Sequence, residues 1–237
     1  MTHPPQKSLA SPLDTLGDKT KVEGFVVDTH ESIRLHGMDV HRDLAVHYSF
    51  AEVLLLTLLG SPPDEATGAA FGVALVFSSP VSIAEAPAHA ARIAQITGSD
   101  AAGVVSLAAI GLAEQARWLL NEHELLLRRL EIAGDGELPA RFCARSEAER
   151  EEVKALRLAL PVPYRQDLVF DSDPGLWPAL LTIFFRCGLR RQEQVLTALV
   201  SSRLVSTAAE GFAGEAGILA SYPVNLPRFD YRPPEDT

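Results

Sequence analysis

The histidines and cysteines of this chain, the usual metal ligands and nucleophiles of proteins, do not form a recognisable set. His36, His41 and His47 are close in sequence but do not share one face of a helix. Cys143 and Cys187 are the only two cysteines, too few for a thiolate metal site or a disulfide framework. We therefore expect no metal site and no bound cofactor.

The composition of the 237-residue chain favours an all-α fold. Alanine and leucine are abundant and lose little entropy on entering a helix, whereas aromatic residues make up only 7% of the chain. A net charge of −10 argues against a nucleic-acid surface, which needs clustered lysine and arginine. The longest uncharged run, residues 66–84, contains two glycines and a proline, so we expect no membrane span. The first residues lack the apolar core of a signal peptide, which predicts a cytoplasmic protein.

Local signals divide the first 130 residues into an arm, an extended segment and helices. Residues 1–20 have the composition of a flexible arm. Residues 21–35 alternate apolar and polar side chains and predict a short extended segment or hairpin. Capping residues and apolar spacing then predict helices at about 50–59, 64–78, 86–97 and 100–130, the last capped by Ser99 or Asp100.

The rest of the chain is also predicted to be helical. Residues 134–145 are expected to form a loop, after which Ser146 caps a helix whose many charges indicate a solvated face. Pro161 and Pro163 end this helix. Two apolar helices are predicted near residues 175–187 and 192–211, followed by a proline-rich extended tail at 222–237.

Three segments resemble the citrate synthase and citryl-CoA lyase superfamily. Residues 32–63, with His36-Gly-Met-Asp-Val40, Ser49-Phe-Ala-Glu-Val53 and Gly60-Ser-Pro-Pro63, resemble the opening of those proteins. Residues 90–100, beginning Ala90-Ala-Arg-Ile-Ala94, resemble a helix end of the family, and Leu199-Val-Ser-Ser-Arg203 resembles a later helix. The chain is similar to a shortened, divergent member of this superfamily.

The resemblance implies an all-α fold with a helical large domain, a small domain and an intimate dimer. In this chain the large domain would comprise residues 21–130 and 170–237, after the arm of residues 1–20. The region between these two parts is shorter than the family pattern, so residues 131–169 would be a reduced small-domain remnant.

The family's chemistry joins or splits a carbon–carbon bond between an acyl-CoA and a keto acid. It needs a carboxylate to take the α-proton, histidines to polarise the reacting oxygens, and arginines to clamp carboxylates. The family's first histidine falls on Ser82, and its His-Gly-Gly loop falls near Trp118. The next histidine falls on Glu137, and the aspartate expected after it falls on Ala144. The resemblance therefore implies that the catalytic histidines are missing.

A second register does not restore the catalytic set. It aligns the later motif with Val162-Pro-Tyr-Arg165, so that Tyr164 replaces the histidine, and it makes Asp171 or Asp173 the aspartate. Glu137 and Asp173 are then the weak catalytic candidates. Of the histidines nearby, His89 is predicted to pack against neighbouring side chains and His123 to be exposed on a helix.

Arg203 is the one arginine that the resemblance carries over as a substrate-binding residue, holding a keto-acid carboxylate. The alternative is an internal ion pair with Glu210 or Glu215, which we favour slightly. A pocket in which Arg203 faces a carboxylate would support binding or catalysis, whereas an apolar or filled pocket would support a structural role.

Three functions follow from the resemblance. The leading hypothesis is a catalytically silent, structural or regulatory subunit that forms a homodimer or a heteromer with an active relative. The second is an active citrate synthase-type acyltransferase or citryl-CoA lyase, with a CoA thioester as substrate. The third is a protein that binds a carboxylate or acyl-CoA.

Small residues in 100–130 and the apolar run at 176–185 predict an obligate dimer, because one small chain cannot easily bury both.

Overall fold

The computed structural model describes residues 25–28, 32–131, 138–166 and 173–213. The chain divides into two compact units, Met1–Ser49 and Phe50–Thr237. The predicted arm and the predicted tail lie outside the described residues. The domain limits proposed above stay predictions.

The first unit contains a small antiparallel sheet. Strands β1 (Val26–Asp28), β2 (Ile33–Leu35) and β3 (Met38–Asp39) pair in that order. His36 and Gly37, with φ of 49° and 84°, form the tight turn between β2 and β3. A π-helical turn η1 (Val40–Leu44) and the short α1 (Ala45–His47) follow. The extended segment predicted from the alternation is therefore confirmed for its described part.

The second unit is helical, and its helices begin close to the predicted residues. They are α2 (Phe50–Leu59), α3 (Glu65–Ser78), α4 (Ala86–Ile96), α5 (Ala101–Glu122), α6 (Glu124–Glu131), the short 3-10 turn η2 (Ala140–Phe142), α7 (Glu147–Ala159), α8 (Val162–Gln166), α9 (Leu176–Arg186) and α10 (Gln192–Phe212). None of the helices in the described ranges is long and apolar enough to cross a membrane.

Side-chain caps explain why several helices begin where they do. Carboxylate oxygens of Asp64 and Asp100 accept hydrogen bonds from the backbone N–H groups of Thr67 and Gly103, at 2.9 and 2.7 Å. The Ser146 hydroxyl accepts one from Glu149 N at 3.1 Å. Of the two residues predicted to cap the helix at residue 100, Asp100 is thus the one that does so.

The helix predicted for residues 100–130 is in fact two helices, α5 and α6. At their junction His123 leaves the helical conformation, with φ −104° and ψ 11°. Its ring nitrogen Nδ1 donates to the Leu119 carbonyl at 2.9 Å, and its ring stacks on Phe142 with centroids 5.3 Å apart. The prediction that His123 is exposed was therefore wrong, because a contact distant in sequence half-buries the ring.

Helix α9 lies at the centre of the hydrophobic core. Its residues from Pro178 to Phe185 are all buried, and Phe184 meets Phe71 of α3 edge to face, with centroids 5.8 Å apart. Residues of α7 and α8, including Leu156 and Tyr164, belong to the same core. The apolar run at 176–185 is thus largely buried within the chain, where α3, α6 and α7 cover it. The obligate dimer stays a prediction.

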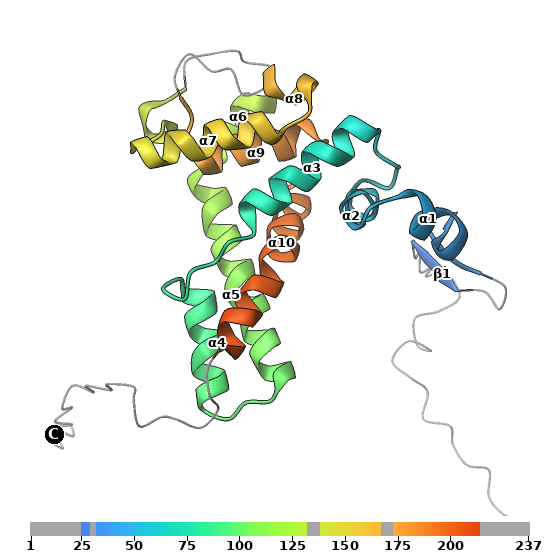
Figure 1. Ribbon diagram of the computed structural model, residues 1–237, viewed down its shortest axis with the longest axis horizontal. Helices are drawn as coiled ribbons and strands as arrows, with labels where there is room; N and C mark the ends of the chain where they lie inside the picture. The colour runs from blue at the N-terminus through green and yellow to red at the C-terminus, as the bar shows by residue number, and fades with distance from the viewer. Residues whose placement is uncertain (1–24, 29–31, 132–137, 167–172, 214–237) are drawn as a thin grey trace, which may run out of the picture. The chain divides into compact units, whose positions relative to one another are not determined.

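Helices α4, α5 and α10 run alongside one another as a tightly packed group (Figure 1). Gly211 of α10 makes the close approach possible: an added Cβ would lie 2.9 Å from Ala91 Cβ and 3.1 Å from Val104 Cγ1. Gly72 of α3 is different, because its nearest neighbour would be Ala51 Cβ at an ordinary 3.5 Å.

This contrast predicts opposite effects of the same substitution. Gly211→Ala should lower the free energy of unfolding by about 1–3 kcal/mol, because rigid neighbours must move. The control Gly72→Ala should leave it unchanged or raise it by up to about 1 kcal/mol, since alanine is the better helix former. Urea denaturation followed by circular dichroism measures both, and equal effects would contradict the close packing.

Candidate functional site

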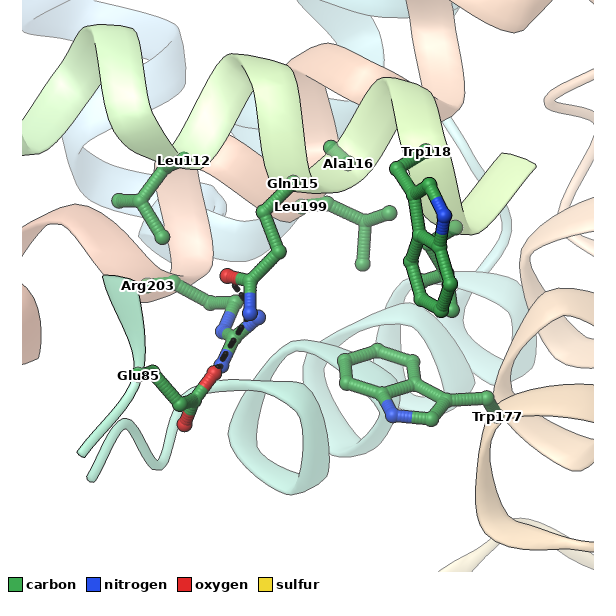
Figure 2. A pocket seen from close by; sticks show the side chains of 9 residues that line it. Glu85, Leu112, Gln115, Ala116, Trp118, Trp177, Leu199 and Arg203 are labelled. Atoms are coloured by element: carbon green, nitrogen blue, oxygen red, sulfur yellow. Dashed lines mark hydrogen bonds and ion pairs between the residues drawn. The ribbon is translucent and has the colours of Figure 1, made fainter. Parts of the chain in front are cut away.

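Arg203 is buried on α10, and both terminal nitrogens of its guanidinium donate hydrogen bonds within the chain, whereas its buried Nε has no hydrogen-bond partner among the described residues. One terminal nitrogen donates to Glu85 Oε2 at 2.6 Å and to the Pro80 carbonyl at 3.3 Å, and the other donates to Gln115 Oε1 at 3.0 Å (Figure 2). Only 7% of the Arg203 side chain is exposed, compared with 29% of Glu85. The arginine therefore does not present an open fork to solvent.

Glu85 is held by donors from three parts of the second unit. It occupies the residue before α4, where its Oε1 accepts from Ser82 N at 2.9 Å. Its Oε2 accepts from Gln115 Nε2 at 2.8 Å as well as from Arg203. Burial alone would raise the pKa of Glu85, but the Ser82 amide, the Gln115 amide and Arg203 outweigh it and hold the pKa below its usual value. The pair is therefore an ionised carboxylate beside a guanidinium.

Two hollows border this ion pair, and both have largely apolar walls. The smaller, about 90 Å³, is bounded by α5, α9 and α10, with Trp118 and Trp177 reaching toward it from two sides (Figure 2). The larger, about 480 Å³, is bounded mainly by α3, α7 and α9 and has Phe77 and Leu176 in its wall. The Arg203 guanidinium carbon lies 5.5 Å from the centre of the Trp177 ring.

The internal pairing of Arg203 was predicted, but with the wrong partner. Glu210 is on the same helix, two turns further along, so the rise of an α-helix places it about 10 Å away along the axis. Glu215 lies outside the described residues. Glu85 and Gln115 were missed. The proline in the first turn of α4 marks Glu85 as the residue before a helix, but no signal in the sequence links it to Arg203.

The other predicted site residues are scattered. Ser82 lies next to the ion pair but is exposed, and its hydroxyl accepts from Ala84 N at 3.2 Å. Trp118 lines the smaller hollow, 63% exposed, but from within α5 and not from a loop. Asp173 is exposed, and its backbone carbonyl accepts from Ala144 N at 3.0 Å.

The remaining candidates do not join the site. Tyr164 is buried, with its hydroxyl 2.8 Å from Thr67 Oγ1, and burial raises its pKa. His89 is exposed on α4, so the prediction that it is a packing residue was wrong. Glu137 and Asp171 lie outside the described residues. Among the residues that are described, no three potential metal ligands of the His, Cys, Asp or Glu type form a cluster.

No protein-family model matches the sequence, and no curated protein matches it. Among solved structures, the chain is similar to citryl-CoA lyase from Hydrogenobacter thermophilus, with a TM-score of 0.60 and 16% sequence identity. The similarity covers 92% of this chain and 97% of that one. The chain therefore has the all-α citrate synthase-like fold, as its sequence predicted.

The depressed pKa of Glu85 predicts a specific loss of stability in acid. An unfolded glutamate takes up its proton near pH 4.5, and the folded one does so at lower pH. The stability that Glu85 contributes is therefore present above about pH 4.5 and is lost as the pH falls through the folded pKa. At pH 7 we expect Glu85→Gln to lower the free energy of unfolding by about 1–3 kcal/mol, and this deficit should shrink in acid.

Glu114→Gln is the matched control for this experiment. Glu114 pairs with Arg117 on α5, where both side chains are more than 60% exposed. Such surface pairs contribute about 0–1 kcal/mol. Denaturant titrations between pH 7 and pH 3 test both variants. A deficit of Glu85→Gln that does not change with pH would contradict the ionised pair.

Proposed function

We propose that this citrate synthase-like protein is catalytically silent on its own and acts as a structural or regulatory subunit. The observation that carries the proposal is the closed pair of Arg203 and Glu85. A substrate carboxylate at Arg203 would have to displace an internal carboxylate that the chain holds with three donors. An intramolecular partner has a large concentration advantage over a ligand in solution.

The neighbourhood of the pair also supports a silent site. Ser82 and Trp118 stand where the resemblance leads one to expect histidines, and neither side chain can act as a general base near neutral pH or supply a positively charged donor. Both hollows that border the guanidinium have largely apolar walls, and Trp177 lines each of them. Among the residues that the structure describes around Arg203, we identify no set of convergent donors that would stabilise a developing enolate.

We also propose that the subunit assembles, as a homodimer or with an active citrate synthase-like relative. The support is apolar surface on the packed helices: Ile110 of α5 is 64% exposed, Leu107 of α5 42%, and Val205 of α10 77%. Large apolar side chains left exposed on adjacent helices are typical of surfaces that bind a partner.

The proposal predicts that the chain alone releases no thiol from acetyl-CoA with oxaloacetate and does not cleave citryl-CoA. Citrate and oxaloacetate should leave its melting temperature unchanged, because Glu85 already occupies Arg203. Glu85→Ala removes this internal carboxylate and frees Arg203, so citrate should stabilise that variant by mass action. The double variant Glu85→Ala, Arg203→Met should lose the response. Light scattering on the same samples gives the assembly state.

Two results would contradict this account. Citrate that raises the melting temperature of the wild type, but not of Arg203→Ala, would show that Arg203 is free to bind a ligand carboxylate. Thiol release abolished by Glu137→Gln or Asp173→Asn would establish an active enzyme instead.

A further inference from the structure

The turn between α9 and α10 presents two arginines in a fixed backbone conformation. Gly188, with φ +101°, ends α9, and Leu189 N donates to the Phe184 carbonyl at 3.1 Å. Leu189 is 1% exposed and anchors the turn in the core. Arg190 and Arg191 follow directly and are exposed.

A buried glutamine locks the backbone at these arginines. Gln194 Oε1 accepts from Arg190 N and from Arg191 N, both at 3.0 Å. Its Nε2 donates to the Leu58 carbonyl of α2 at 2.8 Å. The backbone of Arg190 and Arg191 is thus held by Gln194 of α10, which is itself bonded to α2. Because this backbone is already fixed, less entropy is lost when a ligand binds.

The Arg190 side chain is positioned by an aromatic ring and has no acidic partner. Its guanidinium carbon lies 3.5 Å from the centre of the Phe185 ring, a cation–π contact. In the ranges that the structure describes, no carboxylate lies within ion-pairing distance of Arg190. Its N–H groups are therefore oriented and available.

A hollow of about 200 Å³ brings Arg190 and Arg191 together with Arg128 of α6. Helix α6 lies beside α9 (Figure 1), so the third arginine comes from a separate element. Arg128 pairs with Glu124 at 2.6 Å and Arg191 with Glu193 at 3.3 Å, one contact each. The three arginines and the two glutamates that pair with two of them leave one net positive charge, that of Arg190, in a chain of net charge −10.

We propose that this hollow binds a phosphoryl group, in the form of a diphosphate or the diphosphate end of a larger molecule. Guanidinium groups converging from two elements suit an anion with several oxygens, because each planar fork can pair two of them. Such an anion would also compensate the charge of Arg190, which has no acidic partner among the described residues. Leu127 and Val195 form an apolar part of the wall that a carbon-containing portion of the ligand would contact.

Isothermal titration of the full chain with sodium diphosphate at low ionic strength tests the proposal. We expect saturable binding by the wild type that weakens as salt is added. Arg190→Ala should weaken it about tenfold or more, and Arg190→Glu should abolish it. The matched control is Arg150→Ala, which removes an exposed arginine that pairs with Glu147 outside the hollow and should bind as the wild type does.

Melting without ligand checks that each variant is folded. A wild type that does not bind diphosphate, or an Arg190→Glu variant that binds it as tightly as the wild type, would overturn the proposal. Uridine diphosphate distinguishes the two sources of the group. Tighter binding than that of inorganic diphosphate assigns the site to the end of a larger molecule, and equal affinity assigns it to the free anion.

Discussion

The burial of one guanidinium constrains how the helices of the second unit are arranged. A charge removed from water must be paired and hydrogen-bonded, or the fold loses several kcal/mol. Arg203 of α10 meets this requirement through Glu85 at the start of α4 and Gln115 of α5. The three helices that supply these residues are also the ones brought close by Gly211. Tight packing and charge compensation therefore depend on the same arrangement.

The same interaction connects the fold to the proposed function. The resemblance to citrate synthases implies that Arg203 would hold a ligand carboxylate, but in this structure Glu85 supplies a carboxylate from within the chain. Holding it requires the Ser82 amide, the Gln115 side chain and the ionised state of Glu85. A site filled in this way stabilises the chain and is poorly suited to exchange substrates, which supports the role of a structural or regulatory subunit.

Much of the fold could be predicted from the sequence, because local signals set it. Asp64, Asp100 and Ser146 cap their helices through hydrogen bonds spanning three residues. The break of the helix at His123 was not predicted, because the stacking partner of His123, Phe142, is distant in the sequence. Arg203 could be expected to pair internally. Glu85, 118 residues away, could not be identified as its partner, because helix packing alone brings them together.

The most direct test of the central claim is a double-mutant cycle between Glu85 and Arg203. The free energy of unfolding would be measured for the wild type, Glu85→Gln, Arg203→Met and the double variant at neutral pH. If the pair is buried and hydrogen-bonded, the double variant should lose less free energy of unfolding than the two single variants together, by at least about 1 kcal/mol. Additive effects of the two substitutions would contradict the account, because they would show that the two side chains do not interact.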